Sequence, residues 1–268
     1  MIFEQSFNRL ELLTGKDTLQ RLNATNVIIF GVGGVGSWCA EALIRNGIGN
    51  LTIVDSDRVC VTNINRQLQA TSETIGEIKV NVLKKRLQSI NPDASITALF
   101  KVYNKDSAHS FNIEQYNYCV DAIDSLSNKV ELIVNAYAAG CKVYTSLGAA
   151  CKLDVSRIKT GSLWKSEGCH LGRFVRKRLR KRKFDGDIQC VYSDELLPPI
   201  GVNINGCSTG ECSRNGSANP DNPDTGWCSH EKQINGSAVH ITATFGFFLA
   251  GMITKDIVDH NTHTKDPS

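Results

Sequence analysis

The chain has 268 residues, of which 41% are hydrophobic and 21% are charged, and its formal net charge is only +3. These values are typical of a soluble globular protein, and they exclude a disordered chain or one that is basic throughout. The length fits one large α/β domain, or one domain that carries a substantial insertion.

The N-terminal residues and the cysteines indicate a reducing compartment. Residues 1–6 lack the charged and apolar regions of a secretory signal. Several of the ten cysteines lie in apolar stretches, as Cys119 does, where a reduced buried thiol is the usual interpretation. We therefore expect a cytoplasmic protein. The longest apolar segment, 238–258, contains His240, Lys255 and Asp256, so we expect a buried helix and no membrane insertion.

Strands and helices alternate along the first part of the chain. One or two helices are expected over 6–23, and then strands over 27–30, 51–54 and 96–100 with helices over 34–46 and 76–90 between them. A strand over 118–123, a helix over 127–139 and a strand over 142–147 continue the series. This repetition predicts an α/β fold with a Rossmann-like, doubly wound, mostly parallel sheet and helices on both faces.

A glycine motif follows the first predicted strand. Gly31, Gly33, Gly34 and Gly36 fit G-x-G-x-x-G, a spacing that brings a backbone turn and a helix N-terminus against a phosphate. Asp55 follows Gly31 by 24 residues, where an acid contacts a ribose hydroxyl in this fold. The motif fits NAD, FAD and ATP sites alike, and a solvated acid at a strand end is the alternative for Asp55.

Further polar residues distinguish among these nucleotides. They are Arg9, Asp57, Asn63, Asn65, Arg66, Gln67, Lys79, Asp121 and Asp124. Hydride transfer needs no cations around the phosphates, whereas adenylation builds charge on the α-phosphate and the departing pyrophosphate, which Arg, Lys and Mg²⁺ offset. Mg²⁺ prefers oxygen ligands, so an aspartate is needed to hold it, and Asp121 and Asp124 are the candidates. An ordinary exposed lysine is the alternative for Lys79.

The region after Gly148 contains a strongly basic run. Eight of the eleven residues 173–183 are basic: Arg173, Arg176, Lys177, Arg178, Arg180, Lys181, Arg182 and Lys183. Phe174, Val175 and Leu179 are expected to anchor one face of a short helix. Because a run of one sign repels itself, it favours RNA or another polyanion over a merely solvated face.

The last part of the chain combines a return to the sheet, a long loop and a helix. Residues 189–193 are expected to rejoin the sheet, and 198–236, rich in Pro, Gly, Asn and Ser, to form a mobile loop. This loop contains Cys207, Cys212, Cys228 and His230. Free thiols are the favoured interpretation of the cysteines, while a catalytic cysteine and a metal site that includes His230 stay open. The helix over 237–258 is apolar nearly all round and should pack against the core.

These motifs together resemble the ATP site of the ThiF/MoeB/ubiquitin-activating-enzyme superfamily. The resemblance is dense over about residues 5–150 and resumes in 190–197 and 237–258. It implies one adenylating domain over 1–268, with a nucleotide-binding core (1–150), a basic insertion (151–190), a crossover loop (198–236) and a C-terminal core helix (237–258). It further implies that Asp55 holds the ribose, and that Arg9, Arg66 and Lys79 hold phosphates. Asp124 then positions Mg²⁺, and the glycines, Asp57 and Asn63 complete the ATP site.

Within this superfamily the chain is most similar to the branch that dehydrates N6-threonylcarbamoyladenosine in tRNA. The similarity rests on residues 36–43, 47–49, 59–67, 121–125, 191–195 and 243–247, and the chain has no C-x-x-C pair, which sulfur-carrier-activating relatives often use for zinc. It implies that ATP converts the threonyl carboxylate into an adenylate, which an internal nucleophile attacks to close a ring.

The same resemblance implies that the partners are modified tRNA and a second copy of the chain, and it leaves a sulfur-relay partner open. Two other functions also stay open. One is adenylation of the C-terminus of a ubiquitin-like sulfur carrier, and the other is nucleotide binding without catalysis.

Overall fold

The computed structural model describes residues 5–197 and 236–259, which form one seven-stranded sheet in the order β3-β2-β1-β4-β5-β7-β6. All neighbouring strands are parallel except β6, which runs antiparallel to β7. The strands are β1 Asn26–Phe30, β2 Asn50–Val54, β3 Ser95–Leu99, β4 Tyr118–Asp121, β5 Lys142–Ser146, β6 Ile158–Ser162 and β7 Gln189–Ser193. The predicted doubly wound sheet is confirmed.

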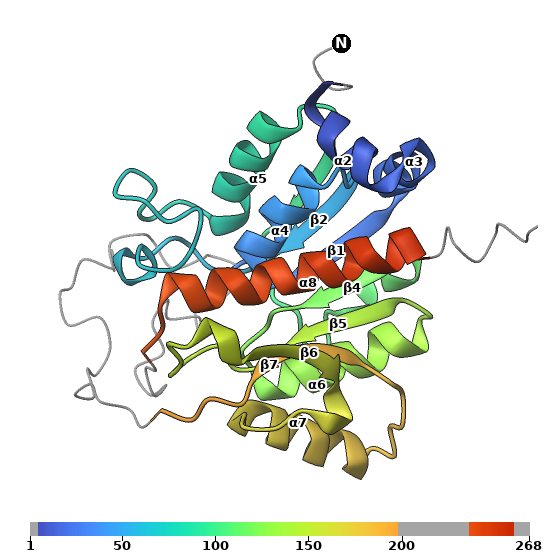
Figure 1. The fold of residues 1–268 in the computed structure, drawn as a ribbon. Coiled ribbons are helices and arrows are strands. Elements are labelled where there is room, and N and C mark those ends of the chain that lie inside the picture. Colours follow the sequence, from blue (N-terminus) through green and yellow to red (C-terminus); the bar gives the residue numbers. More distant parts are fainter. Residues whose placement is uncertain (1–4, 198–235, 260–268) are drawn as a thin grey trace, which may run out of the picture.

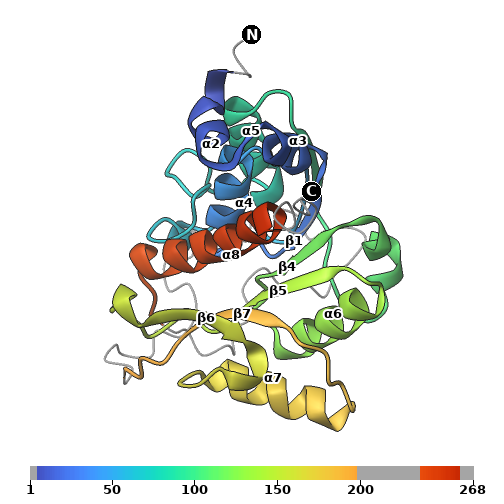
Figure 2. The same ribbon diagram turned by 45° about the vertical axis from the view of Figure 1, so that its right-hand side comes forward.

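Seven helices accompany this sheet in the described residues, and they lie on both of its faces (Figures 1 and 2). They are α2 Asn8–Thr14, α3 Lys16–Ala24, α4 Gly36–Arg45, α5 Lys79–Ile90, α6 Leu126–Ala138, α7 His170–Lys181 and α8 Val239–Asp259. The shorter 3₁₀ turns are η1 Val61–Asn63, η2 Ala108–Phe111, η3 Ile113–Gln115, η4 Val155–Arg157 and η5 Leu163–Lys165.

Each face of the sheet carries its own hydrophobic core. Side chains alternate along a strand, so Val27 and Ile29 of β1 pack with α4, α5 and α8, while Ile28 and Phe30 pack with α6 and α7. All four side chains are fully buried. The continuous apolar run of β1 therefore follows from its position in the middle of a sheet that is covered on both faces.

The order of the strands reverses at the pair β1–β4. From β1 the sheet continues to β2 and β3 on one side, and from β4 to β5, β7 and β6 on the other. Ligands of doubly wound sheets bind beyond the carboxyl ends of the strands at such a reversal. This places the glycine motif, which follows β1, where a nucleotide is expected.

Three details differ from the expectations. Strand β6 was not predicted, because its Lys159, Thr160 and Gly161 give no apolar alternation, as suits an exposed edge strand. Strand β4 ends at Asp121, two residues before the predicted end. Helix α8 buries only one face, since Phe247 and Phe248 remain 49% and 38% exposed.

Helix α8 is also the one described helix that is long and apolar enough to cross a membrane by length and composition. Half of that apolar window is buried within the domain, where α8 packs on α4, and a core helix of a soluble protein passes the same test. The seven described cysteines are free thiols, and Cys119 is fully buried as expected. The loop residues Cys207, Cys212, Cys228 and His230 lie outside the described residues.

Candidate nucleotide site at the carboxyl edge of the sheet

The glycine turn between β1 and α4 combines close backbone packing with one open position. A Cβ atom at Gly31, whose φ is +86°, would lie 2.8 Å from the carbonyl oxygen of Ala122, and one at Gly36 would lie 1.8 Å from that of Gly31. At Gly33 the nearest atom would be 3.8 Å away, on Gln67. Gly31 and Gly36 therefore shape the turn, while Gly33 leaves room for a phosphate at the start of α4.

Asp55 connects the end of β2 to the glycine turn. Its Oδ2 accepts a hydrogen bond from the backbone N–H of Val32 at 2.8 Å, and its Oδ1 accepts one from Asp57 at 2.8 Å. Burial raises the pKa of the Asp55 carboxyl above its ordinary value, against the opposing charge of Lys79. The carboxylate is thus fixed beside the turn, where the fold brings a ribose.

Lys79 is a buried cation at the same edge. Its side chain is 5% exposed, and its Nζ lies 2.8 Å from Oδ2 of Asp57, whose side chain is 63% exposed. The backbone N–H of Lys79 also bonds to the carbonyl of Asp57. The pair places one positive and one negative group next to Asp55. The alternative prediction, that Lys79 is an ordinary exposed lysine, is wrong.

The segment after β2 brings Arg66 over the start of α4. The indole Nε1 of Trp38 donates to the carbonyl oxygen of Arg66 at 3.0 Å, and the buried Asn63 accepts from the N–H of Cys60 at 3.1 Å. Burial lowers the pKa of the Arg66 guanidinium, which nevertheless stays charged at neutral pH. Asn63 therefore holds the turn together, and Arg66 supplies a cation.

A buried ion pair supports the loop that carries Asp124. Lys129 Nζ lies 2.7 Å from Oδ2 of Asp121, which also accepts from Thr145 Oγ1 at 2.6 Å, and both ionic side chains are 0% exposed. The N–H of Ile123 bonds to Oδ1 of Asp121. Asp121 is thereby committed to the interior, whereas Asp124 is exposed at the edge of the sheet.

The residues present fit ATP and a divalent cation. Gln67 is 7% exposed and lies beside Gly33, and its Oε1 has no hydrogen-bond partner among the described residues. A buried acceptor of this kind calls for a donor such as a ribose hydroxyl or bound water. Asp57 and Asp124 offer the oxygen ligands that Mg²⁺ prefers.

Arg9 does not join this group within its own chain. It is exposed on α2, two residues after Phe7, and a Cβ at Gly47 would lie 3.6 Å from the Phe7 ring. Gly47 follows the C-terminal end of α4, about 15 Å along that ten-residue helix from the glycine turn. Figure 1 accordingly shows α2 beside the far end of α4.

The basic run forms helix α7, as predicted, and its cations fall into two groups. Arg176, Arg178 and Arg182 are tied to neighbouring elements through Ser166, Ser127 and Glu131 respectively. Lys177 and Lys181 have no such tie within the described part of the chain, while Arg173 and Arg180 stack on Phe174 and Trp164. Val175 and Leu179 anchor the helix, but Phe174 is 42% exposed and does not.

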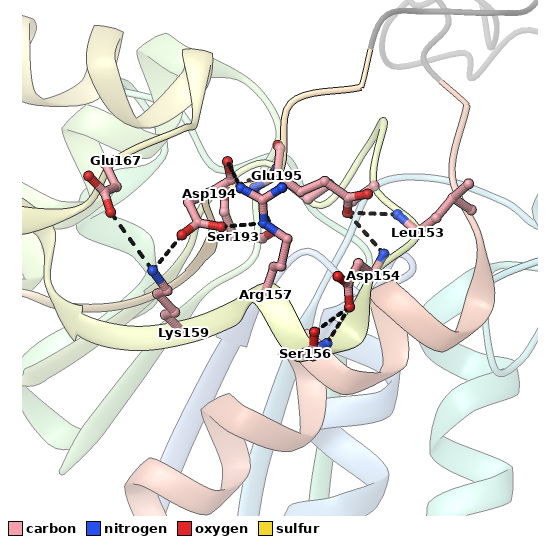
Figure 3. A network of polar contacts seen from close by, with 10 residues as sticks. Leu153, Asp154, Ser156, Arg157, Lys159, Glu167, Ser193, Asp194 and Glu195 are labelled. Atoms are coloured by element: carbon pink, nitrogen blue, oxygen red, sulfur yellow. Dashed lines mark hydrogen bonds and ion pairs between the residues drawn. The ribbon is translucent and has the colours of Figure 1, made fainter.

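A polar network fixes the chain where it leaves the sheet toward residue 198 (Figure 3). Asp194 pairs with Arg157 at 2.7 Å and with Lys159, and these cations lower its pKa. Glu195 Oε2 accepts from the N–H groups of Leu153 and Asp154 at 2.9 and 3.0 Å. The end of β7 is thus held to the start of β6 and to the segment before it, at the edge of the sheet opposite to β3.

Helix α8 contributes to the site in a way that the sequence analysis missed. A Cβ at Gly34 would lie 3.1 Å from the Cβ of Thr242, and one at Gly246 would lie 2.6 Å from the carbonyl oxygen of Val35. Trp38 also packs edge-on against Phe247. A glycine inside an apolar helix was the available signal, because such glycines often mark close packing.

This chain belongs to the ThiF family, whose family model matches residues 6–264. Two relatives that match nearly the whole chain bear the same enzyme name. The chain is 36% identical over 262 residues to the tRNA threonylcarbamoyladenosine dehydratase of Haemophilus influenzae, covering 94% of this chain and 92% of the relative. It is 33% identical to the Escherichia coli enzyme of the same name, covering 96% and 94%.

Solved structures agree with these relatives. The E. coli tRNA N6-threonylcarbamoyladenosine dehydratase TcdA in complex with ATP superposes with a TM-score of 0.81 at 29% identity, over 98% of both chains. A structure of the same enzyme in complex with AMP matches equally well. E. coli MccB with ATP, at 16% identity and a TM-score of 0.58, shares the fold alone.

Proposed function

We propose that this protein is an ATP-dependent tRNA threonylcarbamoyladenosine dehydratase that works through a carboxyl-adenylate. The observation that carries the proposal is the meeting of three segments at one edge of the sheet: the glycine turn, the Arg66 segment and the Asp124 loop. Relatives that share over nine-tenths of their length with this chain bear that name, and TcdA binds ATP and AMP on this fold.

In the proposed reaction the threonyl carboxylate oxygen attacks the α-phosphorus of ATP, and the bond to the departing pyrophosphate breaks. A nucleophile of the modification then attacks the acyl carbon, closes the ring and releases AMP and a proton, so the nucleoside loses the elements of one water and its carboxylate oxygen leaves on AMP. Because this second attack is intramolecular, proximity supplies much of the rate and no enzyme nucleophile is required. Arg66 and Lys79 offset phosphate charge, and Asp55 orients the ribose.

Asp124 would hold Mg²⁺ together with ATP oxygens, and Asp57 is a further exposed carboxylate at the carboxyl edge of the sheet. The bound ion would offset charge on the departing pyrophosphate. Asp121 is paired with Lys129 in the interior and would keep the Asp124 loop in place.

The test compares wild type with Asp124→Asn. Wild type is expected to exchange labelled pyrophosphate into ATP only when modified tRNA is present, and to yield the cyclised nucleoside in digested tRNA. The variant should lose at least about a hundredfold in both rates because the metal ligand is weakened. Its thermal unfolding should be unchanged because the side chain is exposed. A variant that cyclises tRNA as fast as wild type would refute this role of Asp124.

We place the tRNA on helix α7. The side chains of Arg173, Lys177 and Lys181 follow one another at intervals of four residues, which is about 6 Å along a helix. Arg178 donates to Ser127 in the first turn of α6, three residues beyond Asp124, so this helix leads toward the nucleotide site. Arg180 and Lys183 extend the same positive surface.

We further propose a homodimer in which α2 carries Arg9 to the phosphates of the neighbouring subunit. Arg9 cannot reach its own glycine turn, and the adjacent Leu12 and Leu13 are 88% and 82% exposed. Exposed leucines at this density favour a protein contact. The proposed homodimer is compatible with activity in the cytoplasm. It is also compatible with a sulfur-relay partner, but it requires neither.

Activation of a sulfur carrier is the weaker candidate. The molybdopterin-synthase adenylyltransferase of E. coli is 29% identical over 199 residues, which is 73% of this chain. Stimulation of pyrophosphate exchange by a carrier ending in Gly-Gly, and not by modified tRNA, would favour it.

A further inference from the structure

The side chain of Asn65 bridges two parts of the molecule that are far apart in sequence. Its Nδ2 donates to the backbone carbonyl oxygen of Ser237 at 2.9 Å, across 172 positions. Its Oδ1 accepts from Nη1 of Arg66 at 3.0 Å. One amide thus connects the Arg66 guanidinium to Ser237, which lies two residues before helix α8 begins at Val239.

Two acceptors, the amide of Asn65 and the carbonyl of Thr62, orient the Arg66 guanidinium. Nη1 also donates to the carbonyl oxygen of Thr62 at 2.7 Å, and within the described residues Nε and Nη2 have no hydrogen-bond partner. Both acceptors bind the same nitrogen, so they fix the plane of the guanidinium and leave its other N–H groups for a ligand.

The chemistry of an amide suits this place better than a carboxylate. A neutral oxygen orients the guanidinium without cancelling its charge, and the same group supplies the donor for Ser237. The helix that follows Ser237 already packs on the glycine turn through Thr242 and Gly246. The tether therefore attaches the Arg66 segment to the element that also backs the phosphate-binding turn.

We infer that Asn65 is a positioning residue that sets the Arg66 guanidinium for the phosphates by tying it to the start of α8. This rests on the proposed phosphate role of Arg66. Asn65 itself does not touch the nucleotide, so its effect must pass through Arg66.

A double-mutant cycle on the full chain tests this inference, with the dissociation constant of ATP measured by titration calorimetry in the presence of Mg²⁺. Asn65→Ala should weaken ATP binding about tenfold, the value expected for an interaction with a charged group. In an Arg66→Ala background the same change should add less than about twofold, because its target is gone. Asn65→Asp should weaken binding more than Asn65→Ala, because it neutralises Arg66 and places oxygen against oxygen at Ser237.

Asn46→Ala is the matched control. Asn46 also donates from Nδ2 to the α8 region, to Thr254 Oγ1 at 3.1 Å, but at the far end of the helix. It should lower thermal stability as much as Asn65→Ala does and leave ATP binding unchanged.

The outcomes separate this inference from the proposed function. Equal weakening by Asn65→Ala in both backgrounds, or none in wild type, overturns the inference while a large effect of Arg66→Ala upholds the phosphate role. If Arg66→Ala binds ATP as wild type does, the phosphate role and the inference both fail.

Discussion

Gly36 and Gly33 have different roles in the turn, and substituting each by alanine should affect different properties of the protein. Gly36→Ala forces a Cβ to within 1.8 Å of the Gly31 carbonyl oxygen, so the backbone must move, at a cost of about 3 kcal/mol or more. Gly33→Ala meets nothing closer than 3.8 Å and should keep wild-type stability. It should still weaken ATP binding about tenfold, because its methyl group would occupy the position proposed for a phosphate.

Denaturant unfolding and ATP titration distinguish these two effects. If Gly33→Ala binds ATP as tightly as wild type, the phosphates do not approach the turn at that residue. If Gly36→Ala has the same midpoint of denaturant unfolding as wild type, Gly36 does not pack closely against Gly31.

Local spacing was enough to predict most residues of the candidate site, whereas contacts between distant positions could not be predicted from it. Gly31, Gly33, Gly36 and Asp55 were recognisable because one βαβ unit holds them at fixed separations. The contact of Asn65 with Ser237 spans 172 positions, and no local pattern encodes it. The buried state of Lys79 depends likewise on its partner Asp57, 22 positions earlier.

Among the elements, helix α7 gives the clearest experiment. Changing Arg173, Lys177 and Lys181 together to Ala should weaken tRNA binding and lower the slope of log K against log salt by about two to three, from roughly 0.7–0.9 per lost phosphate contact. The control is Arg182→Gln, since Glu131 already neutralises Arg182 at 2.7 Å. An unchanged slope in the triple variant would remove the tRNA from this helix.

Helices α4 and α5 are joined by Glu41, whose effect on stability depends on pH. Burial alone would raise the pKa of Glu41, but Arg86 at 2.6 Å and Arg45 at 2.9 Å outweigh it and lower the pKa below the ordinary 4.5. A lowered folded-state pKa stabilises the fold above the ordinary value, and the gain is lost as the pH falls through the lowered pKa.

Glu41→Gln should therefore reduce the free energy of unfolding by about 1–2 kcal/mol at pH 7, a range that allows for the half-exposed arginines. The difference from wild type should shrink below pH 4.5. Glu77→Gln is the control, because Glu77 and Lys85 are exposed and 3.8 Å apart, and it should change stability by less than about 0.5 kcal/mol. A difference that persists in acid would contradict the role of the ion pairs.

The elements themselves were predictable to different degrees. Helix α5 ends at Ile90, as Asn91-Pro92 indicates, but it begins at Lys79, three residues after the predicted start. Strand β6 escaped detection because an edge strand needs few apolar residues and gains its stability from pairing with β7. The exposed face of α8 also could not be foreseen, since composition does not tell which side of a helix a sheet covers.

At the scale of the whole molecule, the position of Arg9 decides how many subunits make one site. Arg9 lies at the far end of α4 from its own glycine turn, on a helix whose Leu12 and Leu13 are exposed. If α2 reaches a neighbouring subunit, each site combines Arg9 of one copy with Asp124 of the other. Two separately inactive variants should then repair each other.

Arg9→Ala and Asp124→Asn chains, carrying different affinity tags, can be expressed together and the mixed dimer isolated by both tags. In that dimer one site lacks both groups and the other has an intact Asp124 with Arg9 from its neighbour. The mixed dimer should cyclise modified tRNA at about half the wild-type rate, while either homodimer stays inactive, as closed two-fold symmetry requires. A mixed dimer as inactive as its parents would show that Arg9 serves the site of its own chain. Recovery of a monomer carrying full activity would exclude the shared site altogether.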